Sequence, residues 1–247
     1  MLAGTARPAD DRSPGSAAAA VSSVQSVLVD ADQNFVPDRL GESVTVEGIL
    51  TSDPLLTART VALANLQDAT GGVLLFTRAP SRLINRVKAG DEVRVTGVIE
   101  QFQGAEQINV KEIEFLREGV LPEPIAITAS ELNSEQLSGK LVRLRGRIRL
   151  VERPDQEGAR AELRDRTGVV NVFVPTRFYE EPDFLAELPD LHEAEIIGIA
   201  SQSDTEPPFH GGYRLVPRST ADFAFSGPHP TGRFWLPRPW GCCCCHH

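Results

Sequence analysis

A row of arginines in the second half of the chain has the residue type and the spacing to bind phosphate groups. The row consists of Arg143, Arg145, Arg147 and Arg149. Because side chains alternate between the two faces of a β-strand, all four guanidinium groups would lie on one face. Residues 140–177, which include Arg164, carry ten basic and five acidic side chains, a local net charge of +5. Proteins that bind single-stranded nucleic acid use positive grooves, so these five arginines are candidates for that role.

The same residues allow a purely structural interpretation. Exposed strands commonly carry paired charges, and Glu162 and the acidic stretch 180–195 would neutralise the row. Single-strand binding also needs aromatic stacking platforms, whereas we expect Phe173 in the core and Phe178 and Tyr179 in a following helix. The sequence therefore favours ion-paired arginines on a solvated face and keeps nucleic-acid binding as the alternative.

A second candidate site lies near the N-terminus, where oxygen-bearing side chains have the spacing of a calcium loop. Positions one, three, five and nine of that loop would be Asp30, Asp32, Asn34 and Asp38. Phe35 stands where the sharp turn of such a loop requires glycine, and Gly41 stands where the last ligand should be glutamate. A polar turn leading into the first strand explains the same residues without an ion. Calcium is the one cofactor that the sequence suggests.

These residues must be positioned by a repeated β-rich unit, because three blocks recur in the same order. VTVEGI resembles VRLRGRI, LQDATG resembles LRDRTG, and VRVTGV resembles EIIGI. Each block alternates apolar and polar residues, as half-buried strands do. The Asp-x-Thr-Gly within the second block favours a hairpin turn, since Asp bonds backbone N–H groups and Gly accepts positive φ. The glycines inside the other blocks predict bends or bulges.

Each copy therefore has about five strands, with a short helical stretch expected before the fourth at Ser81–Val87 and at Phe178–Leu188. This pattern matches the OB-fold, a five-stranded Greek-key barrel. We predict an all-β chain of two tandem OB-fold barrels. The expected segments are a disordered N-terminal segment (1–27), a first barrel (28–118) with an Asp-rich lead-in (30–42), a connector (119–138), a second barrel (139–226) and a disordered Pro-rich tail ending in Cys and His (227–247).

The loop between strands four and five of each barrel is the third candidate site, because OB-folds often bind ligands there. The candidate residues are Phe102, Gln103 and Gln107 in the first barrel and Gln202, Phe209, His210 and Tyr213 in the second. They offer aromatic surface, amides and one titratable ring. Ordinary closure of the barrel ends is the competing explanation, and the sequence leaves the two open.

The composition of the whole chain limits the functions that are plausible. A net charge of −9 argues against nucleic-acid binding through the entire surface, although an acidic protein can carry a local basic face. No stretch approaches the roughly 18 uncharged apolar residues of a membrane helix, and we see no signal peptide. The motifs of common hydrolases and nucleotide-binding enzymes are missing. We therefore expect a protein that is not an enzyme.

The blocks LxDxTGG and KxGDxVxVxG resemble the OB domains of secreted bacterial proteins, including those attached to nucleases. A longer resemblance, over residues 29–225, is to the tandem OB-type region ahead of the membrane span in some bacterial sensor histidine kinases. The supporting segments are Pro37–Glu42, Asn65–Gly72, Gly198–Gln202, Pro207–Phe209 and Tyr213–Arg218. That family implies an extracytoplasmic sensing role, with a membrane helix and kinase domains outside this chain.

Our leading expectation is thus a binding or sensory module that captures a small ligand or a protein partner outside the cytoplasm. The alternative is a single-stranded nucleic-acid-binding protein, accessory to a nuclease, and cytoplasmic if it stands alone. Salt dependence of binding would separate the two, because phosphate contacts release counterions.

Overall fold

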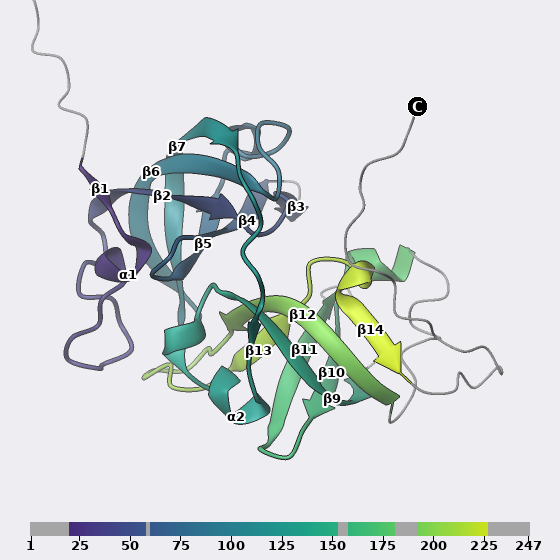
Figure 1. The fold of residues 1–247 in the computed structure, drawn as a ribbon. Helices are drawn as coiled ribbons and strands as arrows, with labels where there is room; N and C mark the ends of the chain where they lie inside the picture. The colour runs from purple at the N-terminus through teal and green to yellow at the C-terminus, as the bar shows by residue number, and fades with distance from the viewer. Residues whose placement is uncertain (1–19, 58–59, 153–157, 181–191, 227–247) are drawn as a thin grey trace, which may run out of the picture.

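The computed structural model describes residues 20–57, 60–152, 158–180 and 192–226, which form two barrels and only two short α-helices (Figure 1). The first barrel comprises β1 (Val21–Ser22), α1 (Val24–Val27), β2 (Ser43–Leu50), β3 (Leu55–Thr57), β4 (Val61–Gln67), β5 (Gly72–Thr77), the 3₁₀ turn η1 (Pro80–Arg82), β6 (Asp91–Phe102) and β7 (Ala105–Glu118). The second comprises β8 (Ile125–Ala126), α2 (Ala129–Leu132), η2 (Glu135–Leu137), β9 (Leu141–Glu152), β10 (Gly158–Arg164), β11 (Val169–Pro175), η3 (Thr176–Glu180), β12 (His192–Gln202), β13 (Tyr213–Val216), η4 (Thr220–Asp222) and β14 (Phe223–Ser226). The expected tails at 1–19 and 227–247 lie outside the described residues.

The strand order identifies each barrel as an OB-fold. Around the first barrel the order is β2-β6-β7-β5-β4, and β4 pairs again with β2 to close the ring. Around the second it is β9-β12-β13-β11-β10, closed in the same way by β9 and β10. Within each ring every pair is antiparallel except the third with the fifth strand, β5 with β7 and β11 with β13. The predicted pair of five-stranded Greek-key barrels is confirmed.

Each barrel has a core of its own, because alternate side chains of every strand point inward. Leu66, Leu75 and Ile99 are fully buried in the first core. Ile148 and Leu163 are fully buried in the second. The residues between these inward positions form the outer faces of the strands, and the candidate arginines are among them.

A lead-in segment precedes each barrel and is part of the repeat. β1 runs parallel to the start of β2, and β8 runs parallel to the start of β9. The hairpin aspartate then caps the helix that follows: the Val24 N–H donates to Asp68 Oδ2 and the Ala129 N–H donates to Asp165 Oδ2, each at 2.8 Å. Hydrogen bonds from neighbouring hydroxyl and N–H groups outweigh partial burial and lower the pKa of both carboxyls.

These lead-ins correct two expected boundaries. Residues 20–27, which the sequence assigned to a disordered segment, form β1 and α1, because Val24 and Val27 pack into the first core. The second half of the expected connector likewise belongs to the second barrel, where Ala129 and Leu132 are buried. The low apolar content of residues 1–27 led to the prediction of disorder. A short helix can nevertheless be held by two buried side chains when a neighbouring turn caps it.

The expected helix before the fourth strand of the first barrel is shorter than predicted. In the first barrel a single 3₁₀ turn, η1, begins at Pro80, and Asn85 has a left-handed φ of 59° that ends the helical path. In the second barrel η3 covers the first residues of the expected helix, and 181–188 lie outside the described residues.

The two barrels meet through a specific junction. The Leu141 N–H donates to the buried Gln67 Oε1 at 2.8 Å, and Arg218 Nη1 donates to the Thr51 carbonyl at 3.0 Å. Gly72 and Gly139 pack backbone to backbone, so closely that a Cβ on Gly72 would lie 2.2 Å from the Gly139 carbonyl carbon. Polar and backbone contacts therefore fix one barrel against the other.

Candidate nucleic-acid interface

The arginine row lies on the outer face of β9, as its spacing predicts, and most of it is ion-paired. Arg145 pairs with Glu195. Arg147 Nε lies 2.8 Å from Glu193 Oε1, and Arg149 Nη2 lies 3.0 Å from Glu162 Oε2. These carboxylates come from the neighbouring strands β12 and β10, so the pairing expected from Glu162 and the acidic stretch describes three of the four arginines. The three side chains are nevertheless 54–79 % exposed.

A cleft of about 670 Å³ opens over the first half of β9. Five arginines line it: Arg143, Arg145, Arg147, Arg164 and Arg166. Its walls are the Ala126–Thr128 lead-in and the Asp165–Thr167 turn, and Glu193 completes the rim. Within the described part of the chain, Arg143, Arg164 and Arg166 form no ion pair. We call this feature the arginine cleft.

The cleft adjoins a second basic surface, the outer face of β9, β10, β11 and β13. Arg147 stands opposite Arg164, Arg160 stands opposite Phe173, and Arg214 stands beside Asn171. We call this surface the basic face and define it by Arg147, Arg149, Arg160, Arg164 and Arg214 together with Phe173. Arg160 is ion-paired with Glu152 at 2.7 Å, so three of these five arginines have a carboxylate partner.

Phe173 is not the core residue that the sequence suggested. Its ring is half-buried on the outer face, and the Arg214 guanidinium carbon lies 4.8 Å from the ring centroid. The side chains that enter the core are those of Val170, Val172 and Val174. Asn171, two residues before Phe173, marks the outward face and was the signal that could have found it. An aromatic ring therefore lies on the same outer face as the arginines.

The first barrel keeps the aromatic ring but none of the five arginines. Phe76 occupies the position of Phe173, opposite Leu63, and the Arg78 guanidinium carbon lies 5.1 Å from its ring centroid. Each of the five arginines has an uncharged counterpart in the first barrel. Ile49 and Thr51 correspond to Arg147 and Arg149 on the first strand. Leu63 and Gln67 correspond to Arg160 and Arg164 on the second strand, and Gln107 corresponds to Arg214 on the fifth. The second barrel docks on part of this face, through Gln67 and the Thr51 carbonyl.

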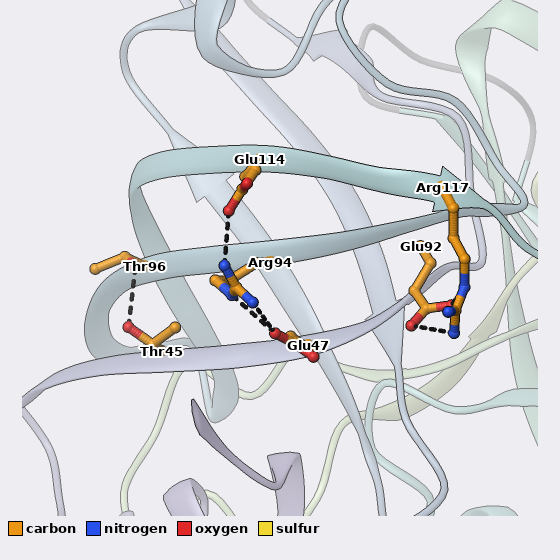
Figure 2. Close-up of polar contacts among 7 residues, drawn as sticks. All are labelled: Thr45, Glu47, Glu92, Arg94, Thr96, Glu114 and Arg117. Atoms are coloured by element: carbon orange, nitrogen blue, oxygen red, sulfur yellow. Dashed lines mark hydrogen bonds and ion pairs between the residues drawn. The ribbon is translucent and has the colours of Figure 1, made fainter. Parts of the chain in front are cut away.

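The ion pairs beside the row are reversed between the barrels. Figure 2 shows Arg94 of β6 between Glu47 of β2 and Glu114 of β7, with Nη1 2.9 Å from the Glu114 carboxylate. Arg145 occupies the position of Glu47, and Glu195 occupies the position of Arg94. The fold thus accepts an ion pair at this position with the cation on either strand, so it does not require arginine on β9.

The loop residues of the third candidate site meet at the junction. The Asp204 N–H donates to the Gln103 carbonyl at 2.8 Å, and Ser203 Oγ lies 3.0 Å from Gln103 Oε1. Gln202 donates to the carbonyls of Phe209 and Gly211. The two loops therefore bind each other across the barrels.

The other residues of that candidate site are dispersed around these loops. His210 lies 6.2 Å from Phe35, measured between ring centroids. Phe102 is 63 % exposed and Gln107 is buried on the outer face of β7. Tyr213 begins β13, where burial and nearby carboxylates raise its pKa to about 12.

One carboxyl at the junction has a strongly raised pKa. Burial, together with the nearby charges of Glu135 and Asp30, raises the pKa of Glu106 to about 8. Burial also raises the pKa of Glu135 itself. Glu106 begins β7, and Glu135 lies in η2 of the second barrel. The junction therefore accumulates negative charge when Glu106 loses its proton.

The Asp-rich lead-in brings Asp30, Asp32 and Asp38 together, with one carboxylate oxygen of each within 4.8 Å of the others. Asn34 directs its backbone N–H toward Asp30 and its amide toward Asp32. The Ala31 N–H donates to Asp38. These are the hydrogen bonds of the polar turn that the sequence offered as the explanation without an ion.

The chain is 28 % identical over 205 residues to the endonuclease YhcR of Bacillus subtilis, a match that covers 80 % of this chain but 16 % of that protein. No protein family model matches the chain. The chain thus corresponds to about a sixth of its nuclease relative.

Solved OB-fold structures resemble parts of the chain only distantly. The second OB-fold domain of replication protein A from Methanococcus maripaludis is 19 % identical, covering 33 % of this chain and 90 % of that one with a TM-score of 0.26. The E. coli protein ygiW is also 19 % identical, covering 39 % and 90 % with a TM-score of 0.30. None of the helices among the described residues has the length and apolarity of a membrane span.

Proposed function

We propose that the chain is a binding module that holds single-stranded nucleic acid and does not cleave it. The observation that carries this proposal is the basic face, where five arginines share one surface with Phe173. Arg160 stands opposite Phe173, and the Arg214 guanidinium lies over its ring. Binding of single strands combines a positive groove for the phosphates with aromatic rings on which bases stack. The second barrel supplies both on one surface.

The relationship to an endonuclease supports the same proposal. A module of this size in such a protein would hold the strand while another part of the protein cuts it. The sensory role that the sequence resemblance implied has no support among the relatives reported above. We therefore retain the nucleic-acid alternative and place the contact on the second barrel.

The proposal is tested by titrating the full chain into a fluorescent single-stranded oligonucleotide of about 16 nucleotides at about 50 mM and about 200 mM salt. Each phosphate contact contributes about 0.7 to the slope of log K against log salt for single strands, so five contacts predict a slope of about −3.5. Duplex of the same sequence should bind more weakly, because its bases are not free to stack on Phe173. Absence of binding, or binding that does not depend on salt, would contradict the proposal.

A further inference from the structure

The arginine cleft extends beyond the basic face and has a different chemistry. It shares Arg147 and Arg164 with that face but continues along β9 to Arg143 and around the hairpin turn to Arg166. None of the twelve described residues that line it is aromatic. A site with cations and no ring suits the backbone of a nucleic acid and not its bases.

The cleft has positive charge that its own carboxylates do not neutralise. Glu193 is engaged with Arg147. Asp165 accepts hydrogen bonds from the N–H groups of Thr167 and Gly168, at 2.7 and 3.1 Å, and from the lead-in helix. Arg143, Arg164 and Arg166 are left without an ion pair among the described residues. Guanidinium groups bind phosphate oxygens in a bidentate manner, so this set is suited to phosphate.

The first barrel shows that these arginines are not needed to build the cleft walls. Asp68 and Thr70 form the same turn and cap the same lead-in helix, with Ala69 at the position of Arg166. Thr45 stands at the position of Arg143, opposite Thr96 on β6. The same turn and helix cap thus form without arginine at these two positions.

The spacing of the arginines along β9 also suits the repeating phosphates of a nucleic acid. Alternate residues of a strand are separated by about 6.7 Å, since each residue advances by about 3.3 Å. Arg143, Arg145 and Arg147 therefore offer a regular series of cations along β9. This series leads to Arg164, where the basic face begins.

We infer that the arginine cleft is a phosphate site that fixes the nucleic-acid backbone next to the stacking face. This inference rests on the proposed function. The phosphate is either an internal diester of the strand or a phosphate at its end, and both present the same oxygens to the arginines.

The test uses Arg143→Gln with Arg166→Gln, which leaves the basic face intact. The matched control is Arg86→Gln with Lys111→Gln, two exposed cations of the first barrel whose loss changes the net charge equally. Three oligonucleotides of one sequence are titrated: one with a 5′-phosphate, one with a 3′-phosphate and one with neither. The control variant should bind all three as the unaltered chain does.

An equal loss of affinity for all three, about tenfold with a salt slope smaller by about 1.4, supports an internal diester. A loss confined to one phosphorylated oligonucleotide supports a terminal phosphate. Unchanged affinity and slope for all three would overturn the cleft site and leave the proposed function standing.

A second readout keeps the two proposals separable. Pyrophosphate should raise the melting temperature of the unaltered chain and not that of the Arg143→Gln/Arg166→Gln variant. If the unaltered chain binds no oligonucleotide, the proposed function fails, and the pyrophosphate result alone then decides whether the cleft binds phosphate. Equal stabilisation of both proteins by pyrophosphate would overturn the cleft site.

Discussion

The two barrels share a fold, a hairpin cap and an aromatic ring on the third strand, yet they use the same outer face in opposite ways. In the first barrel the five positions equivalent to the arginines of the basic face are uncharged, and part of the face receives the second barrel through Gln67 and the backbone at Gly72. In the second barrel the face stays open, and arginine stands at the positions of Gln67 and Leu63. One copy of the repeat has thus become a docking surface and the other a binding surface.

Charge reversal on the basic face should have the largest effect. Arg147→Glu with Arg164→Glu replaces two neighbouring cations by anions, so we expect single-strand affinity to fall by about 100-fold or more at low salt. The matched reversal in the first barrel, Arg86→Glu with Lys111→Glu, should change affinity by less than about threefold, since it alters only the long-range field. Anisotropy titrations measure both. Equal losses in the two variants would mean that binding follows net charge and not the basic face.

Docking on the first barrel should depend on glycine at position 72. In Gly72→Ala the new Cβ would meet the Gly139 backbone, and overpacking of this kind costs about 1–3 kcal/mol. Urea unfolding should show the loss, and small-angle scattering should show a more extended particle. Gly168→Ala is the control, because there the nearest contact would be an ordinary 3.9 Å. Single-strand affinity should survive in both, and its loss in Gly72→Ala would show that the first barrel contributes to the binding surface.

The two phenylalanines should separate docking from binding at the level of single residues. Phe173→Leu removes the ring on which a base stacks and should weaken single-strand binding about tenfold, within the about 1–3 kcal/mol that stacking contributes. Phe76→Leu removes the equivalent ring of the first barrel and should leave affinity within about twofold. Melting temperatures of the two variants serve as the folding control. If Phe76→Leu weakens binding as much, the strand contacts both barrels.

Protonation of Glu106 should have the smallest effect on single-strand affinity, because its consequence is for the stability of the junction. Its folded pKa of about 8 exceeds its usual value, so the folded protein keeps the proton while the unfolded chain has lost it. Stability should therefore fall as the pH rises from about 5 to about 8 and level off above. Glu106→Gln should remove this dependence, so its melting temperature should exceed that of the unaltered chain at pH 9 by more than at pH 5. A constant difference would place Glu106 in solvent.

The sequence predicted the barrels, because strand alternation and the repeated Asp-x-Thr-Gly turn are local signals. It also placed the arginine row on one face and named Glu162 as a partner. It placed Phe173 in the core because it weighed apolarity above alternation, although Asn171 two residues earlier marked the outward face. The junction could not be predicted from the sequence, because the need for glycine at positions 72 and 139 arises only from the contact between the two barrels.

The most direct test of the central claim is to find where the bases lie. A single-stranded oligonucleotide carrying photoreactive 5-iodouracil is bound to the full chain and irradiated, and the crosslinked peptides are identified by mass spectrometry. Crosslinks on the peptide that contains Phe173 are the predicted result. Crosslinks on the peptide that contains Phe76, in place of that peptide, would contradict the assignment of binding to the second barrel.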